Sequence, residues 1–159
     1  MLLVIKILDE ILADDNLVWG KNLENNKQKF LVKLNSEIIE ELTKSRNELD
    51  RIDENELPIF KNNIQKIKKE KLLDGVGFFV VDGVCLENFS VNEKKSIFML
   101  ISKILGELLI QNIQQEKIIV IKDVGKSMKT GGRYHETKEG GSHHTDSPQW
   151  KNVPDWLGL

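Results

Sequence analysis

The three histidines of the chain lie in one short window, His135, His143 and His144, with Glu136 and Asp146 beside them. Because the rest of the chain contains no histidine, this window is the main indication of chemistry in the sequence. In an extended segment, side chains two residues apart point to the same side. The His144 imidazole and the Asp146 carboxylate would then face one point, as two ligands of one metal ion do. His144 and Asp146 are therefore candidate metal ligands.

The kind of metal depends on the third ligand, which the sequence leaves open. One carboxylate and two histidines form the facial triad of non-haem Fe(II) oxygenases, which leaves the opposite face of the ion free for a co-substrate and dioxygen. His135, His143 or Glu136 could supply a third ligand from the same loop, and a His/His/Asp set would also suit tetrahedral zinc. A small zinc-binding module that uses the 135–146 loop is therefore an alternative. An H-x-D tripeptide is also common by chance, so this spacing alone does not establish a metal site.

Other polar residues near the window have both a functional and a plainer interpretation. Lys126 and Arg133 would attract an anionic co-substrate to the loop, although solvated surface charges are the commoner explanation. Gln111 and Asn112 could orient groups around a metal, although polar capping after a helix is commoner. The sequence identifies no catalytic residue beyond the metal ligands and no residue that binds a co-substrate.

Residues 1–74 are predicted to be mainly helical. The first 34 residues have no firm assignment, apart from a short strand-like run at 30–34. Asn35 or Ser36 offers an N-cap for a helix whose apolar residues recur at helical intervals as far as Ile52. Pro58 suits the first turn of a second helix, which should stop before Gly75.

Residues 75–124 predict a strand, a helix and a second strand. The apolar run 77–83 lies between glycines and is rich in aromatic and β-branched residues, as in a buried strand. Ser90 and Glu93 have the spacing of a capping box, and the helix that they open should end near Gly106. Residues 117–122 predict the second buried strand. From residue 125 to 159 we expect a glycine-rich active-site loop and then the start of a further strand.

Length and composition indicate one globular domain over residues 1–159, because 40% of the residues are hydrophobic and 30% are charged. The net charge of −2 does not suggest nucleic acid as a partner, and the basic stretch 66–71 is best explained as a solvated helix face. The apolar start of the chain is too short to span a membrane. Cys85 is the only cysteine and is expected to act as a small buried hydrophobe. We expect a cytoplasmic protein without a membrane partner.

An ordered series of segments from residue 72 to 146 resembles the taurine-dioxygenase-like (clavaminate-synthase-like) oxygenases. Residues 72–83 resemble the entry of that family, in which a glycine leads into a strand, and residues 89–106 resemble its next helix. Residues 111–112 and 118–125 resemble the strand that leads to the active-site loop. Residues 132–135 and 142–147 resemble the loop that carries the H-x-D pair.

This resemblance implies a fold, a cofactor and a reaction. The implied fold is α+β, a partial double-stranded β-helix (jelly roll) with the N-terminal helices packed outside. His144 and Asp146 would be the first two iron ligands. Oxygenases of this family couple the decarboxylation of 2-oxoglutarate to the oxidation of a substrate C–H bond, most often to a hydroxyl group. The expected partner is therefore a small-molecule substrate.

The chain departs from the family pattern at its C-terminal end. The second histidine ligand and the arginine that pairs with 2-oxoglutarate lie well downstream of the H-x-D step in that family, whereas this sequence stops at Leu159. We therefore expect an N-terminal portion that lacks the second half of the fold and does not turn over alone. A second chain that completes the fold, or self-association, would supply the rest. A non-catalytic remnant or binding subunit is the alternative.

Overall fold

The computed structural model describes residues 20–132, 136–139, 151 and 153–159, and these divide between two units. The first unit ends at Leu105 and contains the helices and the sheet. The second unit begins at Gly106, and its described part contains one short 3-10 turn, η7 (Met128–Thr130).

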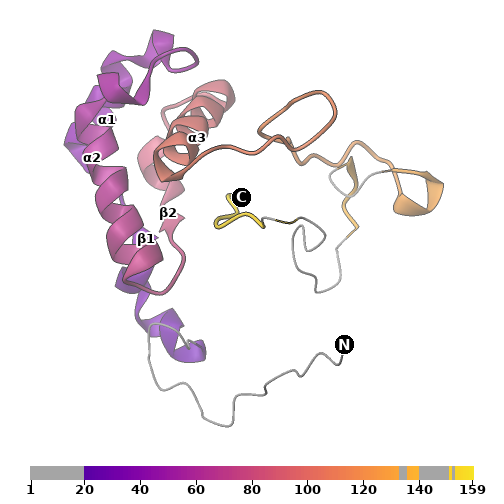
Figure 1. Ribbon diagram of the computed structural model, residues 1–159, viewed down its shortest axis with the longest axis horizontal. Coiled ribbons are helices and arrows are strands. Elements are labelled where there is room, and N and C mark those ends of the chain that lie inside the picture. The colour runs from indigo at the N-terminus through magenta and orange to yellow at the C-terminus, as the bar shows by residue number, and fades with distance from the viewer. Residues whose placement is uncertain (1–19, 133–135, 140–150, 152) are drawn as a thin grey trace. The chain divides into compact units, whose positions relative to one another are not determined.

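The first unit contains three α-helices and two very short strands, which Figure 1 labels. Five short 3-10 helices, η1 to η4 and η6, lie before or between these elements. A short π-helix, η5, extends the second α-helix. In chain order the elements are η1 (Lys21–Asn25), η2 (Lys27–Lys29), β1 (Leu31–Val32), α1 (Ser36–Lys44), η3 (Arg46–Glu48), η4 (Glu54–Glu56), α2 (Pro58–Ile67), η5 (Lys68–Leu73), β2 (Val80–Val81), η6 (Gly83–Leu86) and α3 (Val91–Leu105).

Helix α1 begins where the sequence predicts but ends earlier. The side chain of Asn35 accepts a hydrogen bond from the Ile38 backbone N–H at 3.0 Å, which is the expected N-cap. The helix then stops at Lys44, and a 3-10 turn follows. Leu49 and Ile52 are buried although neither lies in a helix. Their helical spacing reflects a shared core and not one continuous helix, so the predicted extension to Ile52 is wrong.

Helix α2 has Pro58 at its first position, as predicted. Its end is a π-turn that runs up to Leu73, and the chain turns away at Gly75. A Cβ atom at Gly75 would lie 2.4 Å from the carbonyl oxygen of Glu70, so only glycine lets the chain pass this close to the preceding turn. Gly77 follows with φ of +83°. The predicted stop before Gly75 is therefore confirmed, and close backbone approach explains it.

Two lysines of the basic stretch within α2 and η5 contact segments that are distant in sequence. The Lys68 ammonium donates to the Leu105 carbonyl at 2.6 Å, at the C-terminal end of α3. The Lys71 ammonium donates to the Gln28 carbonyl at 2.7 Å. Two of the lysines that might have formed a phosphate-binding patch therefore satisfy backbone carbonyls of the first unit.

Helix α3 opens with the predicted capping box. The Glu93 backbone N–H donates to Ser90 Oγ at 3.3 Å, and the Ser90 backbone N–H donates to Glu93 Oε2 at 2.5 Å. The helix ends at Leu105, next to Gly106, also as predicted. The predicted helix is thus confirmed at both ends, because residues close in sequence specify both.

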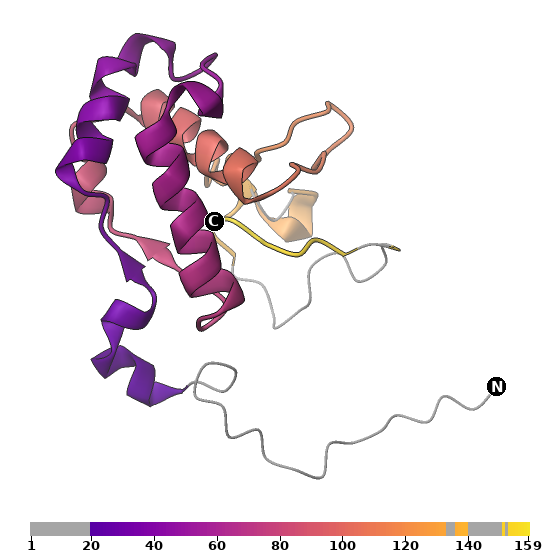
Figure 2. The same cartoon turned by 60° about the vertical axis from the view of Figure 1, so that its left-hand side comes forward.

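The core of the first unit lies among the three helices, which Figure 2 shows packed against one another. Its largest side chains are almost completely removed from solvent, which is the main source of stability for a unit of this kind. They are Phe60, Ile38, Leu42, Leu57, Ile64, Ile97 and Leu100. Cys85 packs against this core and is half-buried, close to its predicted role.

The sheet consists of β1 and β2 in parallel, with Leu31 opposite Val80 and Val32 opposite Val81. The Val80 backbone N–H donates to the Phe30 carbonyl at 2.9 Å. The predicted strand-like runs 30–34 and 77–83 contain these two strands. In each run, however, only two residues take part in the strand pairing. Val80 remains 47% exposed, so β2 is not the buried strand that the run 77–83 predicts.

The predicted jelly roll is wrong. A jelly roll is built from two antiparallel sheets, whereas the described residues form one parallel pair of two-residue strands beside a helical core. The second predicted strand, residues 117–122, is not a strand in the structure, and Val120 and Ile121 are 63% and 60% exposed. Strand propensity measures how well a side chain fits a pleated, half-buried surface. Without neighbouring strands in the described chain, that propensity produces no sheet.

In the described part of the chain, no helix is both long and apolar enough to cross a membrane.

Candidate functional site

The two predicted metal ligands, His144 and Asp146, lie outside the described residues, as do Arg133, His135 and His143. The prediction for them stays a prediction. The described flanks of their loop, residues 124–132 and 136–139, are nevertheless informative. They define the local structure from which the chain enters the H-x-D segment.

An ion pair and a backbone hydrogen bond join the two flanks. The Val124 backbone N–H donates to the Glu136 carbonyl at 3.0 Å. The Lys126 ammonium pairs with Oε1 of the half-buried Glu136 side chain. Chain segments ten to twelve residues apart therefore meet at these two contacts.

A second carboxylate closes the same loop from the other side. Oε1 of Glu139 accepts from Ser127 Oγ at 2.6 Å, and its Oε2 accepts from the Met128 backbone N–H at 3.1 Å. The Glu139 backbone N–H donates to Oγ1 of Thr137 at 3.2 Å, and Thr137 is 6% exposed. We call Val124, Lys126, Ser127, Glu136 and Glu139 the loop clasp.

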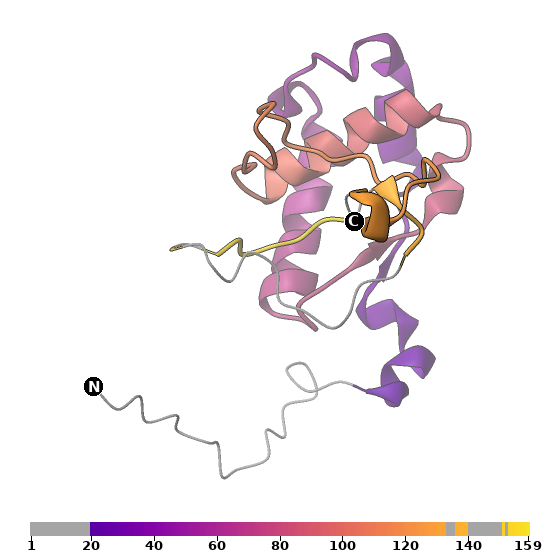
Figure 3. The ribbon, with the colours of Figure 1, turned by 90° about the vertical axis from the view of Figure 1, so that its right-hand side faces the viewer.

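Two glycines let the loop clasp close tightly around η7, the orange helical turn in Figure 3. Gly131 has φ of +87°, which favours glycine. A Cβ atom at Gly132 would lie 2.8 Å from the Lys126 Cβ and 3.0 Å from the Ser127 carbonyl oxygen. The glycine-rich composition of this region thus has a structural reason in the loop itself.

The clasp engages two carboxylates near the histidine window. Glu136 was one candidate for the third metal ligand, but one of its oxygens is paired with Lys126. To bind a metal through that oxygen, it would have to give up this ion pair. The same ion pair engages Lys126, which was a candidate for attracting an anionic co-substrate. This ion pair makes Glu136 less available as a metal ligand and Lys126 less available to an anionic co-substrate.

Sequence reasoning identified Glu136 and Lys126 but missed Ser127 and Glu139. Ser127 also caps η7, since its Oγ accepts from the Lys129 backbone N–H at 3.2 Å. A serine before a short turn is a weak signal that the sequence does contain. The bond between Ser127 and Glu139 spans twelve positions, and local patterns do not predict such a contact.

Gln111 and Asn112 close a turn of their own. The Gln111 backbone N–H donates to the Glu116 carbonyl at 2.7 Å, and the Glu116 backbone N–H donates to Asn112 Oδ1 at 3.0 Å. Gln115 in this turn has φ of 64°, which is rare for residues other than glycine. The two residues form a turn between α3 and the 117–122 run and do not cap the helix.

Among the described residues, three carboxyl groups have a lowered pKa, and these three lie in the first unit. Hydrogen bonds from Ser90, with Arg46 as a further cause, lower the pKa of Glu93. Hydrogen bonds from Asn55 lower the pKa of Asp53, and the bond to Lys44 lowers that of Glu40. Perturbed groups often mark functional sites. Here each cause is a helix cap or a helix-surface ion pair.

Arg46 anchors the start of α3. Its Nε lies 2.6 Å from Glu93 Oε1, and its Nη2 donates to the Asn88 carbonyl. The centre of its guanidinium group lies 5.0 Å from the centroid of the Phe89 ring, within the range of a cation–π contact. Arg46 therefore fixes the turn before α3, and its role is structural.

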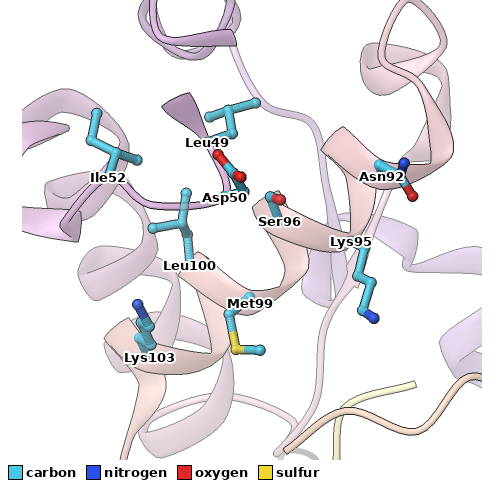
Figure 4. Close-up of a pocket in the computed structure, with 9 residues that line it drawn as sticks. All are labelled: Leu49, Asp50, Ile52, Asn92, Lys95, Ser96, Met99, Leu100 and Lys103. Atoms are coloured by element: carbon cyan, nitrogen blue, oxygen red, sulfur yellow. The ribbon is translucent and has the colours of Figure 1, made fainter. Parts of the chain in front are cut away.

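A groove in the first unit was not expected from the sequence. It has a volume of about 370 Å³ and lies between one face of α3 and the chain after η3. Figure 4 shows Leu49 and Ile52 on one side and Met99 and Leu100 on α3. Lys95 and Lys103 belong to the same lining and lie two helical turns apart, so their ammonium groups do not converge on one point.

Within the described residues, which contain none of the three histidines, no group of three His, Cys, Asp or Glu side chains could hold a metal. Comparison with known proteins gives no match to a protein-family model, a curated protein or a solved structure. The resemblance to the taurine-dioxygenase-like oxygenases therefore rests on the residues of this sequence alone.

Proposed function

We propose that the chain provides part of the active site of an Fe(II)- and 2-oxoglutarate-dependent oxygenase, with His144 and Asp146 as two of the iron ligands. The observation that carries the proposal is the H-x-D spacing, in a window that holds every histidine of the chain. The ordered resemblance of residues 72–146 to the taurine-dioxygenase-like oxygenases supports it. The proposal concerns these ligands and this chemistry and does not include a jelly-roll fold.

The donor set fits iron in its chemistry. An imidazole nitrogen and a carboxylate oxygen are two members of the facial triad, and the remaining positions on iron then accept another histidine, 2-oxoglutarate and dioxygen. When bound, the metal with its co-substrate would supply oxidation of a C–H bond, for which hydroxylation of a small molecule is the usual result. The part of this chain is to hold the ion through His144 and Asp146.

The loop clasp supports the proposal through geometry. A metal site needs ligands whose positions are fixed by neighbouring hydrogen bonds. Glu139 lies five positions before His144, and its carboxylate is fixed by Ser127 and Met128. The chain is therefore anchored at Glu139. We propose that this anchor limits the conformations available to the ligand pair.

Anaerobic titration of the full chain with Fe(II), with and without 2-oxoglutarate, tests the proposal. If the chain assembles the site, by itself or as a dimer, a visible charge-transfer band appears in the ternary complex and is lost in His144→Ala and in Asp146→Ala. If no band appears, the site needs the missing second half of the fold. His143→Ala is the matched control, because its side chain points away from the pair in an extended segment. A band that His143→Ala removes and His144→Ala leaves intact would refute the ligand assignment.

Zinc binding is the second candidate function, and the clustering of His135 and His143 near the ligand pair favours testing it. A zinc site within the loop would take three or four of these side chains. Tight zinc binding that is lost in His135→Ala as well as in His144→Ala would support this module and not the oxygenase. Failure to bind either metal would leave the alternative of a non-catalytic subunit that needs a partner chain.

We further propose a cytoplasmic location for this chemistry. The single cysteine supports it weakly, because a chain with one thiol can form no internal disulfide.

A further inference from the structure

An exposed apolar run lies in the second unit between the 111–116 turn and the loop clasp. Val120, Ile121 and Val124 are 63%, 60% and 56% exposed. The sequence around them is charged at both ends, with Glu116 and Lys117 before the run and Lys122 and Asp123 after it. Val120 and Ile121 are adjacent, and Ile118 and Ile119 before them are half-buried. Exposed β-branched residues side by side indicate a surface that pairs with another segment.

The backbone of residues 117–122 is also unpaired within the described chain. No N–H or C=O group of these six residues is hydrogen-bonded to another described residue. The chain bends at Lys117 and Ile118. Fully extended, these six residues would span about 20 Å, which is the usual length of one strand. The run therefore combines the residue types of a strand with the open backbone groups of a sheet edge.

The charges at the ends of the run are arranged for self-recognition. In an antiparallel pair of two identical runs with Ile119 opposite Ile119, Glu116 of each copy lies opposite Lys122 of the other. Ile118 then lies opposite Val120 on the same face, between the two charge pairs. This register gives two opposite-charge pairs and a centre of β-branched pairs. Oε2 of Glu116 accepts from Asn112 Nδ2 within its own turn at 2.5 Å, so Glu116 meets Lys122 through Oε1.

Neighbouring arrangements are less favourable. A slip that puts Ile119 opposite Val120 places Lys117 against Lys122 and Glu116 against Asp123, so like charges meet at both ends. A parallel pair in register places every charge opposite its own copy. Like charges directly opposite each other destabilise a sheet. The charge pattern therefore selects antiparallel pairing over parallel pairing and disfavours this slip.

We propose that residues 117–122 form an interface with the same residues of a second copy of this chain, as an antiparallel strand pair in which Glu116 meets Lys122. The pair is isologous, since one two-fold axis through Ile119 relates the copies. It brings exposed apolar side chains together and pairs the open backbone groups along one edge. A pair of strands alone is only marginally stable, so association is weak and depends on concentration.

The interface does not use His144 or Asp146. Self-association and iron binding therefore test different properties of the chain, and either can fail without the other.

The test is analytical ultracentrifugation of the full chain over a wide concentration range, with four variants. Ile119→Pro should abolish association, because proline removes a backbone donor and does not fit inside a paired strand. Lys122→Glu should weaken it by about tenfold, since two attractive pairs become repulsive. The double variant Glu116→Lys/Lys122→Glu should restore it. Lys129→Glu, the same charge change on an exposed residue outside the run, should have no such effect.

Restoration by the double variant would establish both the surface and its register. A wild-type chain that stays monomeric at the highest concentration would overturn the proposal. So would association that persists in Ile119→Pro, or a double variant that is as weak as Lys122→Glu. Circular dichroism of each variant should match the wild type, because residues 116–122 do not belong to the helical unit.

Discussion

The N-terminal cap of helix α2 comes from a side chain on another helix. We therefore predict that replacing either of two adjacent glutamates has very different effects on the free energy of unfolding. Leu57, at the N-cap, has no side-chain group that could cap the helix, and Pro58 has no N–H. The next two backbone N–H groups donate to one carboxylate, that of Glu41 on α1. Ile59 N lies 3.1 Å from Oε1, and Phe60 N lies 2.7 Å from Oε2.

Replacing Glu41 by alanine should therefore leave both donors without their partner. Loss of an N-cap costs about 0.5–2 kcal/mol, and loss of a negative charge at a helix N-terminus costs about 0.3–1 kcal/mol. We expect a total of about 1–2 kcal/mol, which corresponds to a lower melting temperature by several degrees for a unit of this size. Glu41→Gln retains an acceptor but loses the charge, so it should cost about half as much.

Glu40→Ala is the matched control, because Glu40 is next to Glu41 and makes only an exposed pair with Lys44 on the same helix. Exposed pairs of this kind contribute little to stability. Urea unfolding followed by far-ultraviolet circular dichroism measures all three variants. Equal unfolding midpoints for Glu41→Ala and Glu40→Ala would refute the assignment of Glu41 as the cap of α2. The charge-dependent part of the effect should also decrease at high salt.

Two further predictions concern backbone approach and pH. Gly75→Ala should destabilise the first unit by about 1–3 kcal/mol, because the new Cβ meets backbone atoms of the preceding turn. Gly83→Ala, where the Cβ meets nothing within 4 Å, should be close to neutral in the same thermal melt; equal losses would contradict the steric explanation. Because the pKa of Glu93 is lowered in the folded state, its ionised carboxylate contributes to folding stability in full above the ordinary glutamate pKa of about 4.3. This contribution is lost as pH falls through the lower folded pKa. The stability difference between wild type and Glu93→Gln should therefore shrink in urea titrations as pH falls through this range, because the Ser90 backbone N–H and Arg46 hold the ionised carboxylate. A difference that stays constant would show that ionised Glu93 does not contribute this stability.

The elements that the sequence predicts well are those whose signals lie within a few residues. Asn35 caps α1, and Ser90 and Glu93 cap α3, through bonds that span three positions. Pro58 and Gly75 mark the limits of α2 and its π-turn, because one fixes φ and the other permits close approach. Such features follow from local stereochemistry and need no knowledge of the rest of the fold.

The candidate site also has one part that the sequence reveals and another part that depends on contacts distant in sequence. The histidine window and the H-x-D spacing are visible in the sequence, and they suffice to suggest a metal and its first two ligands. The clasp between Ser127 and Glu139 is not visible there, because it joins positions twelve apart across a loop. The third ligand stays open for the same reason, since any residue that a loop can carry to the site is a candidate.

The tertiary structure decided the features that depend on partners distant in sequence. The apolar runs at 77–83 and 117–122 have similar strand propensity, yet only the first pairs in the described chain, and only over Val80 and Val81. A helix can form its hydrogen bonds within one segment, whereas a strand needs a second segment at the right distance and register. The sequence by itself thus determined where the helices begin and which residues could bind a metal. The extent of the sheet, the cap that α1 gives to α2 and the closure of the loop were settled by contacts that no local pattern specifies.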